Sequence, residues 1–413
     1  MKVLIVSQHY WPEEFLINAV AADLQANGTE VSVLTGQPNY PGGSVFEGYT
    51  AFSWGQSTGH DAIRLFRVPV IPRKHGKSFN LILNYVSFVL FGVVFAPFLL
   101  RNEKFDVIFV YGNSPIYQAL VGIWLRLIKQ VPLIIWVQDL WPDVLVGTGM
   151  IKNRFLLNII GYTVNWIYKR ADLILAQSKS FLSEILKRAP SAEVHYHPNP
   201  GIKLTDSSGF NDLKLDEVFS IMFAGNLGRA QALETIVGAA RLLRDQSDIV
   251  FVLIGQGTEL EKLRCIAEDE KLNIRLPGAY PRDDMQNILY QSNALLLTLT
   301  GNPIVSKTIP SKLQTYFSVG KPVIAAINGD AADLILEAEA GYVGPAEDAY
   351  QLSQNILNLK SVGKTEQQRL GENGLNYFDK HFRSDKLTNN LRLHFEGAVL
   401  KYNADRSKKG ARS

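Results

Sequence analysis

Two segments of this 413-residue chain have the residue types and spacing needed to bind a phosphorylated ligand. The first, FAGNLGR at 223–229, follows an apolar run of strand length and precedes a helical pattern. Backbone N–H groups at the start of a helix attract phosphate, and Arg229 can add a charge-assisted hydrogen bond. The second, Thr308 to Lys312, places two hydroxyls and an ammonium before another helix. We therefore predict one diphosphate site built from both segments, with tight turns and solvated cations as the alternative.

Carboxylates and aromatic side chains gather after two expected strands in the N-terminal half. His9-Tyr10-Trp11 is followed by Glu13 and Glu14, and Asp139 lies in QDLWPD at 138–143. Functional groups collect at the carboxyl ends of parallel strands, and a buried carboxylate is costly unless it is paired or catalytic. The aromatic rings either pack beneath a sugar or lipid or fill a core. The sequence contains no Asp-x-Asp pair to hold a divalent ion on a diphosphate, so we predict no metal and no cofactor.

The elements that must position these residues form an alternating α/β pattern. Strands are expected at 2–6, 31–34, 106–110, 133–137 and 172–176, and again at 220–224, 250–254, 273–276, 294–297 and 322–326. Helical segments between such runs indicate parallel sheets covered by helices. A Pro/Asn cluster at 197–201 and a polar stretch to about 216 separate the two sets. We predict two Rossmann-like doubly wound domains, 1–200 and 201–385, facing across an interdomain cleft, with a helix and basic tail at 386–413.

The composition excludes several other classes of protein. Hydrophobic residues make up 46% and charged residues 20%, which is typical of a globular chain with large cores. The net charge is only +3, so no global basic surface suggests a nucleic-acid partner. The single cysteine, Cys265, cannot form an intramolecular disulfide.

The longest uncharged apolar stretch spans 78–100 and is long enough to cross a bilayer as a helix. A crossing would place the strands at 2–6 and 106–110 on opposite sides of the membrane, although both fit one sheet. We expect instead a monotopic segment that enters one leaflet with Phe88 and Phe91 facing lipid, and a core helix is the alternative. Nearby basic residues would contact anionic headgroups: Arg73, Lys74, Lys77, Arg101 and Lys104.

Taken together, these segments resemble family-4 retaining glycosyltransferases with the GT-B fold. The resemblance is closest to the bacterial branch that assembles capsule, O-antigen or exopolysaccharide units and includes fucosyl- and N-acetyl-fucosaminyltransferases. It covers most of the chain. It is carried by TGQPNYPGG at 35–43, FEGY at 46–49, VQDLWPD at 137–143, RADLILAQS at 170–178, AGNLGRAQ at 224–231 and TIPSKLQ at 308–314.

The resemblance implies a nucleotide-diphosphate sugar held by the second domain and a polyprenyl-diphosphate-linked saccharide acceptor held by the first. The residues expected to bind the donor are Gly225, Asn226, Gly228, Arg229, Gly255, Gly257, Gly278, Tyr280, Thr308, Ile309, Pro310, Ser311, Lys312 and Gln314. The candidates for a protein base are Asp139, Glu13 and Glu14, although the leaving diphosphate can itself accept the proton in retaining transfer.

The chain departs from the family pattern at several of these positions. Gln138 stands where many members have a histidine, and Gln231 stands where a lysine is usual. Lys307 and Thr315 occupy the positions of a common glutamate pair, so Lys312 or Gln314 would take over its ribose and sugar contacts. Glu13-Glu14 replaces a glycine pair in the first loop, a departure that concerns the acceptor contacts.

We therefore expect a glycosyltransferase at the inner face of the cytoplasmic membrane, with a UDP-linked donor such as UDP-N-acetyl-fucosamine. Two alternatives remain open. A nucleotide-sugar 2-epimerase shares the two-domain architecture and needs no lipid acceptor. A non-catalytic sugar-binding scaffold subunit would be consistent with Gln138 and the absent glutamate pair.

Overall fold

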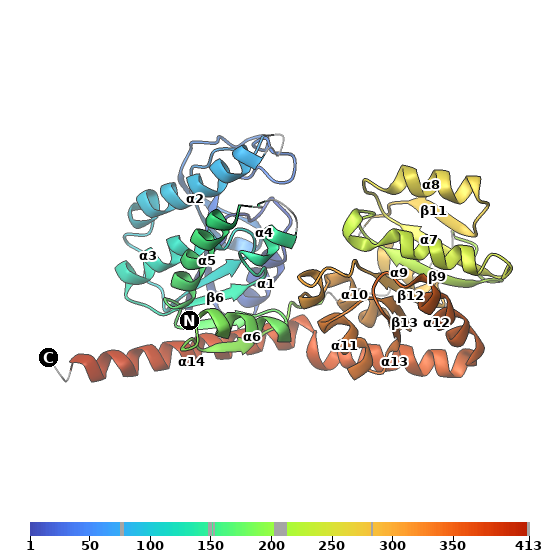
Figure 1. Ribbon diagram of the computed structural model, residues 1–413. Coiled ribbons are helices and arrows are strands. Elements are labelled where there is room, and N and C mark those ends of the chain that lie inside the picture. Colours follow the sequence, from blue (N-terminus) through green and yellow to red (C-terminus); the bar gives the residue numbers. More distant parts are fainter. Residues whose placement is uncertain (75–77, 148–150, 152, 202–212, 282–283, 411–413) are drawn as a thin grey trace. The chain divides into compact units, whose positions relative to one another are not determined.

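The chain forms two compact units, each built around its own sheet (Figure 1). The first unit comprises Met1–Pro198 and Asp385–Ser413, and the second unit comprises Asn199–Ser384. The C-terminal residues, which the sequence set apart as 386–413, therefore group with the first unit. The computed structural model describes residues 1–74, 78–147, 151, 153–201, 213–281 and 284–410.

The first unit contains an eight-stranded sheet in the order β3-β4-β2-β1-β5-β6-β7-β8. The pairs are parallel except that β3 runs antiparallel to β4. The strand order reverses between β1 and β5, and ligands of such sheets bind beyond the carboxyl ends of the strands at this switch point. The bounds are β1 Lys2–Val6, β2 Glu30–Gly36, β3 Gly55–Thr58, β4 Arg64–Val68, β5 Val107–Gly112, β6 Leu133–Val137, β7 Leu173–Ala176 and β8 Val194–Tyr196.

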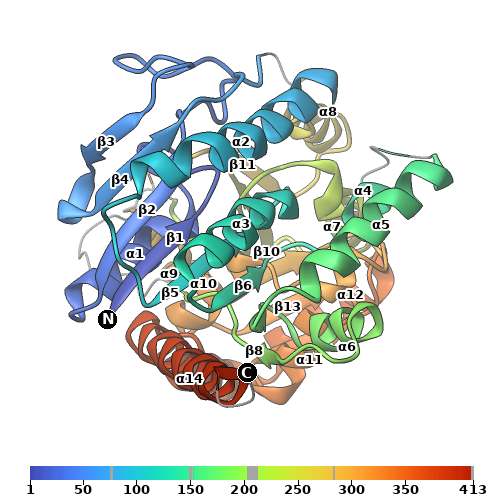
Figure 2. The same ribbon diagram turned by 90° about the vertical axis from the view of Figure 1, so that its left-hand side faces the viewer.

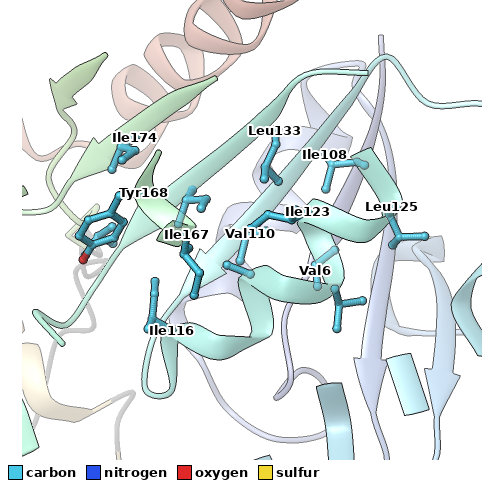
Figure 3. Packing of buried hydrophobic residues seen from close by; sticks show 14 of the residues in the cluster. Val6, Ile108, Val110, Ile116, Ile123, Leu125, Leu133, Ile167, Tyr168 and Ile174 are labelled. Carbon is cyan, nitrogen blue, oxygen red and sulfur yellow. The ribbon is translucent and has the colours of Figure 1, made fainter. Parts of the chain in front are cut away.

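Helices cover both faces of the first sheet. One face carries α2 (Ser78–Leu99), α3 (Ala119–Lys129), α5 (Arg154–Tyr168) and α6 (Lys179–Arg188). Figure 3 shows this core, in which Ile108 and Leu133 of the strands pack with Ile123 of α3 and Ile167 of α5. Each such buried side chain contributes about 1.5–3 kcal/mol of hydrophobic stabilisation, so these helices are firmly attached to the sheet.

The opposite face carries α1 (Leu16–Ala26) and the long C-terminal helix α14 (Ser384–Gly410). Leu387, Leu391 and Phe395 recur every four residues along α14 and are all buried, because this spacing places them on one side of a helix. The ring of Phe395 packs edge-on against Phe109 of β5, with centroids 5.1 Å apart. This apolar stripe attaches the C-terminal helix to the first sheet.

The apolar stretch at 78–100 forms α2, which is long and apolar enough to cross a membrane. One of its faces, however, is fully buried and carries Asn84 and Phe88. The Gln8 amide nitrogen donates to the Asn84 oxygen over 2.8 Å, and the Asn84 amide donates to the Ile71 carbonyl over 2.7 Å. The expectation that Phe88 faces lipid is therefore wrong, because the helix lies along the sheet with this side chain in the core.

The second unit contains a six-stranded parallel sheet in the order β11-β10-β9-β12-β13-β14. Its switch point lies between β9 and β12, so the loops after these strands flank the position where a ligand is expected. The strands are β9 Phe219–Ala224, β10 Ile249–Ile254, β11 Ile274–Gly278, β12 Ala294–Thr298, β13 Val323–Ala326 and β14 Gly341–Gly344. The covering helices are α7 Leu233–Leu242, α8 Leu260–Asp269, α9 Met285–Tyr290, α10 Ser311–Val319, α11 Asp330–Glu337, α12 Ala349–Ser361 and α13 Gly363–His381.

The predicted α/β class with two doubly wound sheets is confirmed, and all ten expected strands occur. Four further strands, β3, β4, β8 and β14, had no expected counterpart. Three of these lack the apolar run that marks a buried strand: β3 reads GQST, β8 has three residues, and β14 begins and ends with glycine. Helix α1 begins at Leu16, which leaves Glu13 and Glu14 in the preceding loop.

Candidate functional site

A cavity of about 500 Å³ opens at the carboxyl edge of the second sheet. Six of the predicted donor-binding residues line it: Gly225, Asn226, Gly255, Tyr280, Ser311 and Lys312. Gly225 and Asn226 follow β9, and Ser311 and Lys312 form the first turn of α10. The structure thus brings the glycine-containing turn and the second cation-bearing segment to one cavity. Its remaining wall is largely apolar: Ala224, Ile254, Ala279, Met285, Leu289 and Tyr316, with Gln231 and Thr315.

Lys312 is the most distinctive residue of this cavity. Its ammonium lies 3.9 Å from the centroid of the Phe223 ring and donates a hydrogen bond to the side-chain oxygen of Gln231. Among the described residues no carboxylate forms an ion pair with it. Burial without a counter-ion lowers the pKa of Lys312 to about 7. A largely desolvated cation of this kind is well suited to an anionic ligand, which would supply the missing counter-charge.

Gln231 stands where the family usually has a lysine, so the sequence indicated only the loss of a cation there. In the structure, this side chain contacts Lys312. A lysine at this position would place a second ammonium against Lys312, whereas the glutamine oxygen accepts a hydrogen bond from it. Thr315, one helical turn beyond Ser311, also lines the cavity, at a position where the family commonly has a glutamate. The only sequence signal for either residue was its departure from the family pattern.

The glycines of the site are required by close backbone approach. A Cβ atom on Gly225 would lie 3.2 Å from the Lys312 nitrogen, and one on Gly255 would lie 1.9 Å from the Gly225 carbonyl oxygen. Gly255 also has φ +140°, and its N–H donates to the carbonyl of Gly278 over 2.8 Å. A Cβ atom on Gly257 would lie 2.2 Å from the Leu227 oxygen. Gly257 therefore lets two loops pack together and does not line the cavity.

Arg229 does not join Lys312. Its side chain is 92% exposed and pairs with Glu259, with 3.4 Å between the arginine Nε and a carboxylate oxygen. Together with Gly228 it lines a separate cavity of about 320 Å³ that also contains Glu234 and Lys262. The predicted clamp of two cations on one diphosphate is therefore not formed in this structure.

Four other predicted donor residues have structural roles. The Thr308 hydroxyl donates to the Val305 carbonyl over 2.8 Å, and Ile309 is buried in the core of the second unit. Pro310 directly precedes the first residue of α10. The Gln314 amide donates to the Asn199 carbonyl over 2.8 Å and so attaches the start of the second unit to α10.

In the first unit, Asp139 follows β6 and lies beside the loop after β5. One of its oxygens accepts hydrogen bonds from the Ser114 backbone N–H over 3.0 Å and from the Ser114 hydroxyl over 2.8 Å. Burial raises the pKa of Asp139, and the two bonds from Ser114 oppose that rise. A carboxylate fixed through one oxygen and with a raised pKa is a stronger proton acceptor than an ordinary aspartate.

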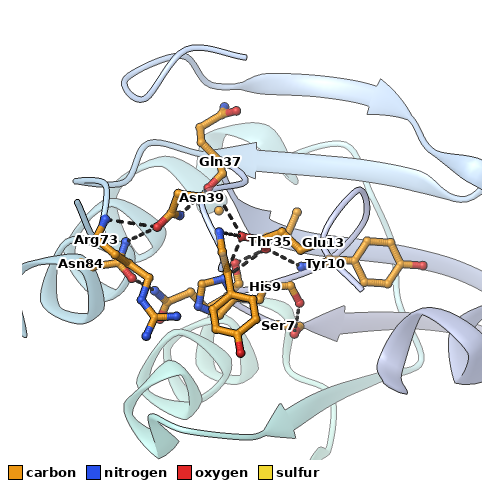
Figure 4. A network of polar contacts seen from close by, with 12 residues as sticks. Ser7, His9, Tyr10, Glu13, Thr35, Gln37, Asn39, Arg73 and Asn84 are labelled. Atoms are coloured by element: carbon orange, nitrogen blue, oxygen red, sulfur yellow. Dashed lines mark hydrogen bonds and ion pairs between the residues drawn. The ribbon is translucent and has the colours of Figure 1, made fainter. Parts of the chain in front are cut away.

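Glu13 is the centre of a buried network at the carboxyl ends of β1 and β2 (Figure 4). One of its oxygens accepts from the backbone N–H groups of Asn39 and Tyr40, each over 2.7 Å. The other accepts from the Tyr10 N–H over 3.2 Å, and the His9 ring nitrogen Nδ1 lies 3.1 Å from both oxygens. This carboxylate holds two loops together, which favours a structural role, whereas Glu14 is exposed.

Arg73 stands at the edge of the same network (Figure 4). Its backbone N–H donates to the Asn39 side chain over 3.2 Å, and its guanidinium lies 4.9 Å from the Tyr40 ring centroid and 6.0 Å from that of Tyr85. Among the described residues no carboxylate forms an ion pair with this guanidinium. The sequence had assigned Arg73 only to lipid headgroups, because its aromatic neighbours come from distant segments.

Among the described residues, no cluster of three or more His, Cys, Asp or Glu side chains is arranged to hold a metal ion. The cavity at the carboxyl edge of the second sheet contains Lys312 as its charged side chain, with Gln231, Asn226, Ser311 and Thr315 as polar neighbours. The chemistry that these residues offer is the binding and charge stabilisation of an anion.

Comparison with known proteins gives two family matches that together cover most of the chain. Residues 16–200 match the model described as "Glycosyl transferase 4-like domain", and residues 209–377 match "Glycosyl transferases group 1". Among solved structures, HepE of Anabaena in complex with UDP superposes with a TM-score of 0.68 at 14% identity, covering 96% of this chain and 100% of HepE. That similarity shows the fold.

Two curated proteins are more similar in sequence. A protein named as a colanic acid biosynthesis glycosyl transferase, WcaI of Escherichia coli K12, is 25% identical over 78% of this chain and 82% of its own. The second is N-acetylgalactosamine-N,N'-diacetylbacillosaminyl-diphospho-undecaprenol 4-alpha-N-acetylgalactosaminyltransferase of Campylobacter jejuni, which is 24% identical over 42% of this chain and 46% of its own. The chain belongs to glycosyltransferase family 4, and it is a glycosyltransferase with the GT-B fold.

Proposed function

We propose that the protein is a retaining, metal-independent glycosyltransferase of bacterial surface polysaccharide synthesis, in capsule, O-antigen or exopolysaccharide assembly. Its donor is a UDP-linked sugar such as UDP-N-acetyl-fucosamine, and its acceptor is a saccharide on a polyprenyl diphosphate. The enzyme works peripherally at the inner face of the cytoplasmic membrane. The HepE structure is a complex with UDP, and the name of the Campylobacter jejuni relative includes a diphospho-undecaprenol, which supports this choice of donor and acceptor.

The observation that carries the proposal is the largely desolvated Lys312 ammonium beside Gly225, on a residue that is half-buried. During transfer, the bond between the anomeric carbon and the diphosphate oxygen breaks, and the acceptor oxygen bonds to the same carbon on the same face. Negative charge then grows on the leaving diphosphate. A cation already desolvated at that place stabilises the developing charge without reorganisation, which is the largest contribution that such a site can make.

The first unit offers the acceptor two groups. The Asp139 oxygen that Ser114 does not hold is the proposed acceptor of the hydroxyl proton, and the Arg73 guanidinium is the proposed partner of the acceptor diphosphate. An arginine held over two tyrosine rings keeps its charge and its planar donors available for phosphate oxygens.

The function is tested by incubating purified protein with a panel of UDP-, GDP-, CMP- and dTDP-sugars and a polyprenyl-diphosphate saccharide in vesicles. We expect that a UDP-sugar increases the mass of the acceptor by one sugar and that this transfer continues in the presence of EDTA. NMR of the product should show that the anomeric configuration of the donor sugar is retained. Conversion of a nucleotide sugar without acceptor would instead identify a 2-epimerase. Binding without any turnover would identify a scaffold subunit, and either result would contradict the proposal.

Asp139→Asn tests the proposed base. We expect kcat to fall by about 10²-fold, the lower end of the range for general-base catalysis, because the amide cannot take the acceptor proton. Donor affinity, measured by calorimetry, should not change, since the donor cavity lies in the second unit. An unchanged kcat would show that the leaving diphosphate itself accepts the proton.

A further inference from the structure

Three helices of the first unit share an unusual exposed surface. Helices α2, α3 and α5 pack by their buried faces on the same side of the sheet, so their outer faces point away from it together (Figure 2). More than half of the large hydrophobic side chains that are exposed in the described part of the chain lie on these three helices. The apolar stretch at 78–100 accounts for only part of them.

Helix α2 exposes one continuous apolar stripe. Its members recur every three or four residues from Phe79, which is 69% exposed, to Phe98, which is 65% exposed. Two aromatic side chains of the β3 region extend this stripe sideways, since Phe52 contacts Phe91 and Trp54 contacts Phe95, with ring centroids 6.5 and 5.1 Å apart.

Helix α5 carries a second stripe, which the sequence did not reveal. Phe155, Ile159, Tyr162 and Trp166 follow one another at intervals of four, three and four residues, and each is exposed. Phe155 and Tyr162 are 74% and 75% exposed, which is unusual for aromatic residues on a helix whose other face is core. Such stripes mark an interaction surface.

Helix α3 connects the two stripes. It lies between α2 and α5 (Figure 2) and contacts both. Its Trp124 indole N–H donates to the Val93 carbonyl of α2 over 3.1 Å, and the Trp124 ring remains 40% exposed. The apolar surface therefore continues from one stripe to the other.

The charges on this surface identify its partner. The sequences of α2, α3 and α5 contain no Asp or Glu, whereas basic residues stand at their ends: Arg101, Lys104, Arg154, Lys169 and Arg170. The Arg170 guanidinium lies 4.9 Å from the centroid of the Trp166 ring, so a cation and an aromatic side chain meet at the end of α5. Apolar and aromatic side chains with cations at the helix ends are typical of the interface of an anionic lipid bilayer.

We propose that the membrane-binding surface consists of α2, α3 and α5 together, and that the α5 stripe is a second, independent contact with anionic lipid. If α2 alone contacted the bilayer, the first unit could rotate about the axis of that helix. A second contact fixes this orientation and holds the carboxyl edge, with Asp139 and Arg73, at a constant height. This inference rests on the proposed membrane-bound function.

Flotation of the full chain with vesicles tests it, and the vesicles contain no acceptor, so the result does not depend on catalysis. The double variant Phe155→Ser/Tyr162→Ser changes two side chains that are about three-quarters exposed. The matched control, Tyr350→Ser/Leu400→Ser, removes comparably exposed apolar groups from α12 and α14. Melting temperatures verify that all variants fold.

With phosphatidylglycerol-containing vesicles, we expect the α5 variant to bind at least tenfold more weakly than the wild type and the control to bind like the wild type. Replacing phosphatidylglycerol by phosphatidylcholine should weaken binding by the wild type as well. An α5 variant that binds like the wild type would overturn the proposal. So would wild-type dimers, seen by light scattering, that become monomers in the α5 variant, because the stripe would then be a contact between copies.

Discussion

Lys312→Met is expected to abolish most nucleotide binding while leaving the free protein at least as stable as the wild type. Hydrogen bonds to a charged group contribute about 1.5–3 kcal/mol, so the dissociation constant of UDP should rise by about 10- to 150-fold. Methionine fills a similar volume without a charge, so the cost of burying an unpaired ammonium disappears. Titration calorimetry measures the first effect, and the melting temperature of the nucleotide-free protein measures the second.

The pH dependence of this binding has a definite sign. The pKa of Lys312 is lowered from 10.5 to about 7, so between these values the unfolded chain binds more protons than the folded one, and stability from this group rises with pH. A bound diphosphate favours the ammonium, so UDP binding should weaken from pH 7 to pH 9 in the wild type. In Lys312→Met the affinity should be flat over the same range.

Arg229→Ala is the matched control for this site. The Arg229 side chain is almost fully exposed and lines another cavity, so its removal should change UDP affinity little. A loss as large as that of Lys312→Met would show that the loop after β9 moves when the donor binds, and that both cations contact the diphosphate as the sequence predicts.

Glu13→Ala is expected to destabilise the first unit by about 3–5 kcal/mol. Removing this carboxylate leaves the buried N–H groups of Tyr10 and Asn39 and the part-buried N–H of Tyr40 without acceptors, and His9 without its partner. The six tryptophans of the chain all lie between residues 11 and 166, so their fluorescence follows unfolding of the first unit alone.

The neighbouring residue provides the control for this prediction. Glu14 is exposed, and Glu14→Ala should change the free energy of unfolding by less than about 0.5 kcal/mol. Urea unfolding followed by tryptophan fluorescence measures both variants. If Glu13→Ala is as stable as the wild type but has lost turnover, Glu13 is a catalytic base and the structural role proposed here is incorrect.

Much of the fold follows from local sequence patterns. Strand β10 is a continuous apolar run and β9 is interrupted only by Ser220, as expected for strands buried on both faces, and the turns after them contain the glycines that close approach requires. Strands such as β8 and β14 gain their stability from neighbours in the sheet, which no local pattern records. The attachment of α14 to the first sheet depends on a contact between Phe395 and Phe109, 286 positions apart, which is equally invisible in the sequence.

The site was predictable to the extent that its chemistry is local. Gly225 and Lys312 were expected because Gly225 directly follows a strand and Lys312 stands in the first turn of a helix, and the parallel sheet brings those positions to one edge. The exclusion of Arg229 was not predictable, because it depends on the direction of one exposed side chain and on Glu259, 30 positions away. The role of Glu13 depends on a loop from another strand, and the exposure of α5 depends on which of its faces meets the sheet.

Nucleotide selectivity in the absence of metal shows directly whether Lys312 holds a UDP-linked donor. The measurement is the melting temperature of the detergent-purified protein with UDP, GDP, CMP or dTDP, with and without EDTA. Ligands that bind the folded state raise this temperature by mass action, and at a given concentration a tighter ligand raises it further. We predict a rise with UDP that persists in EDTA and is lost in Lys312→Met. A rise with UDP that requires added divalent metal, or that persists in Lys312→Met, would show that the donor is not held by Lys312 without metal.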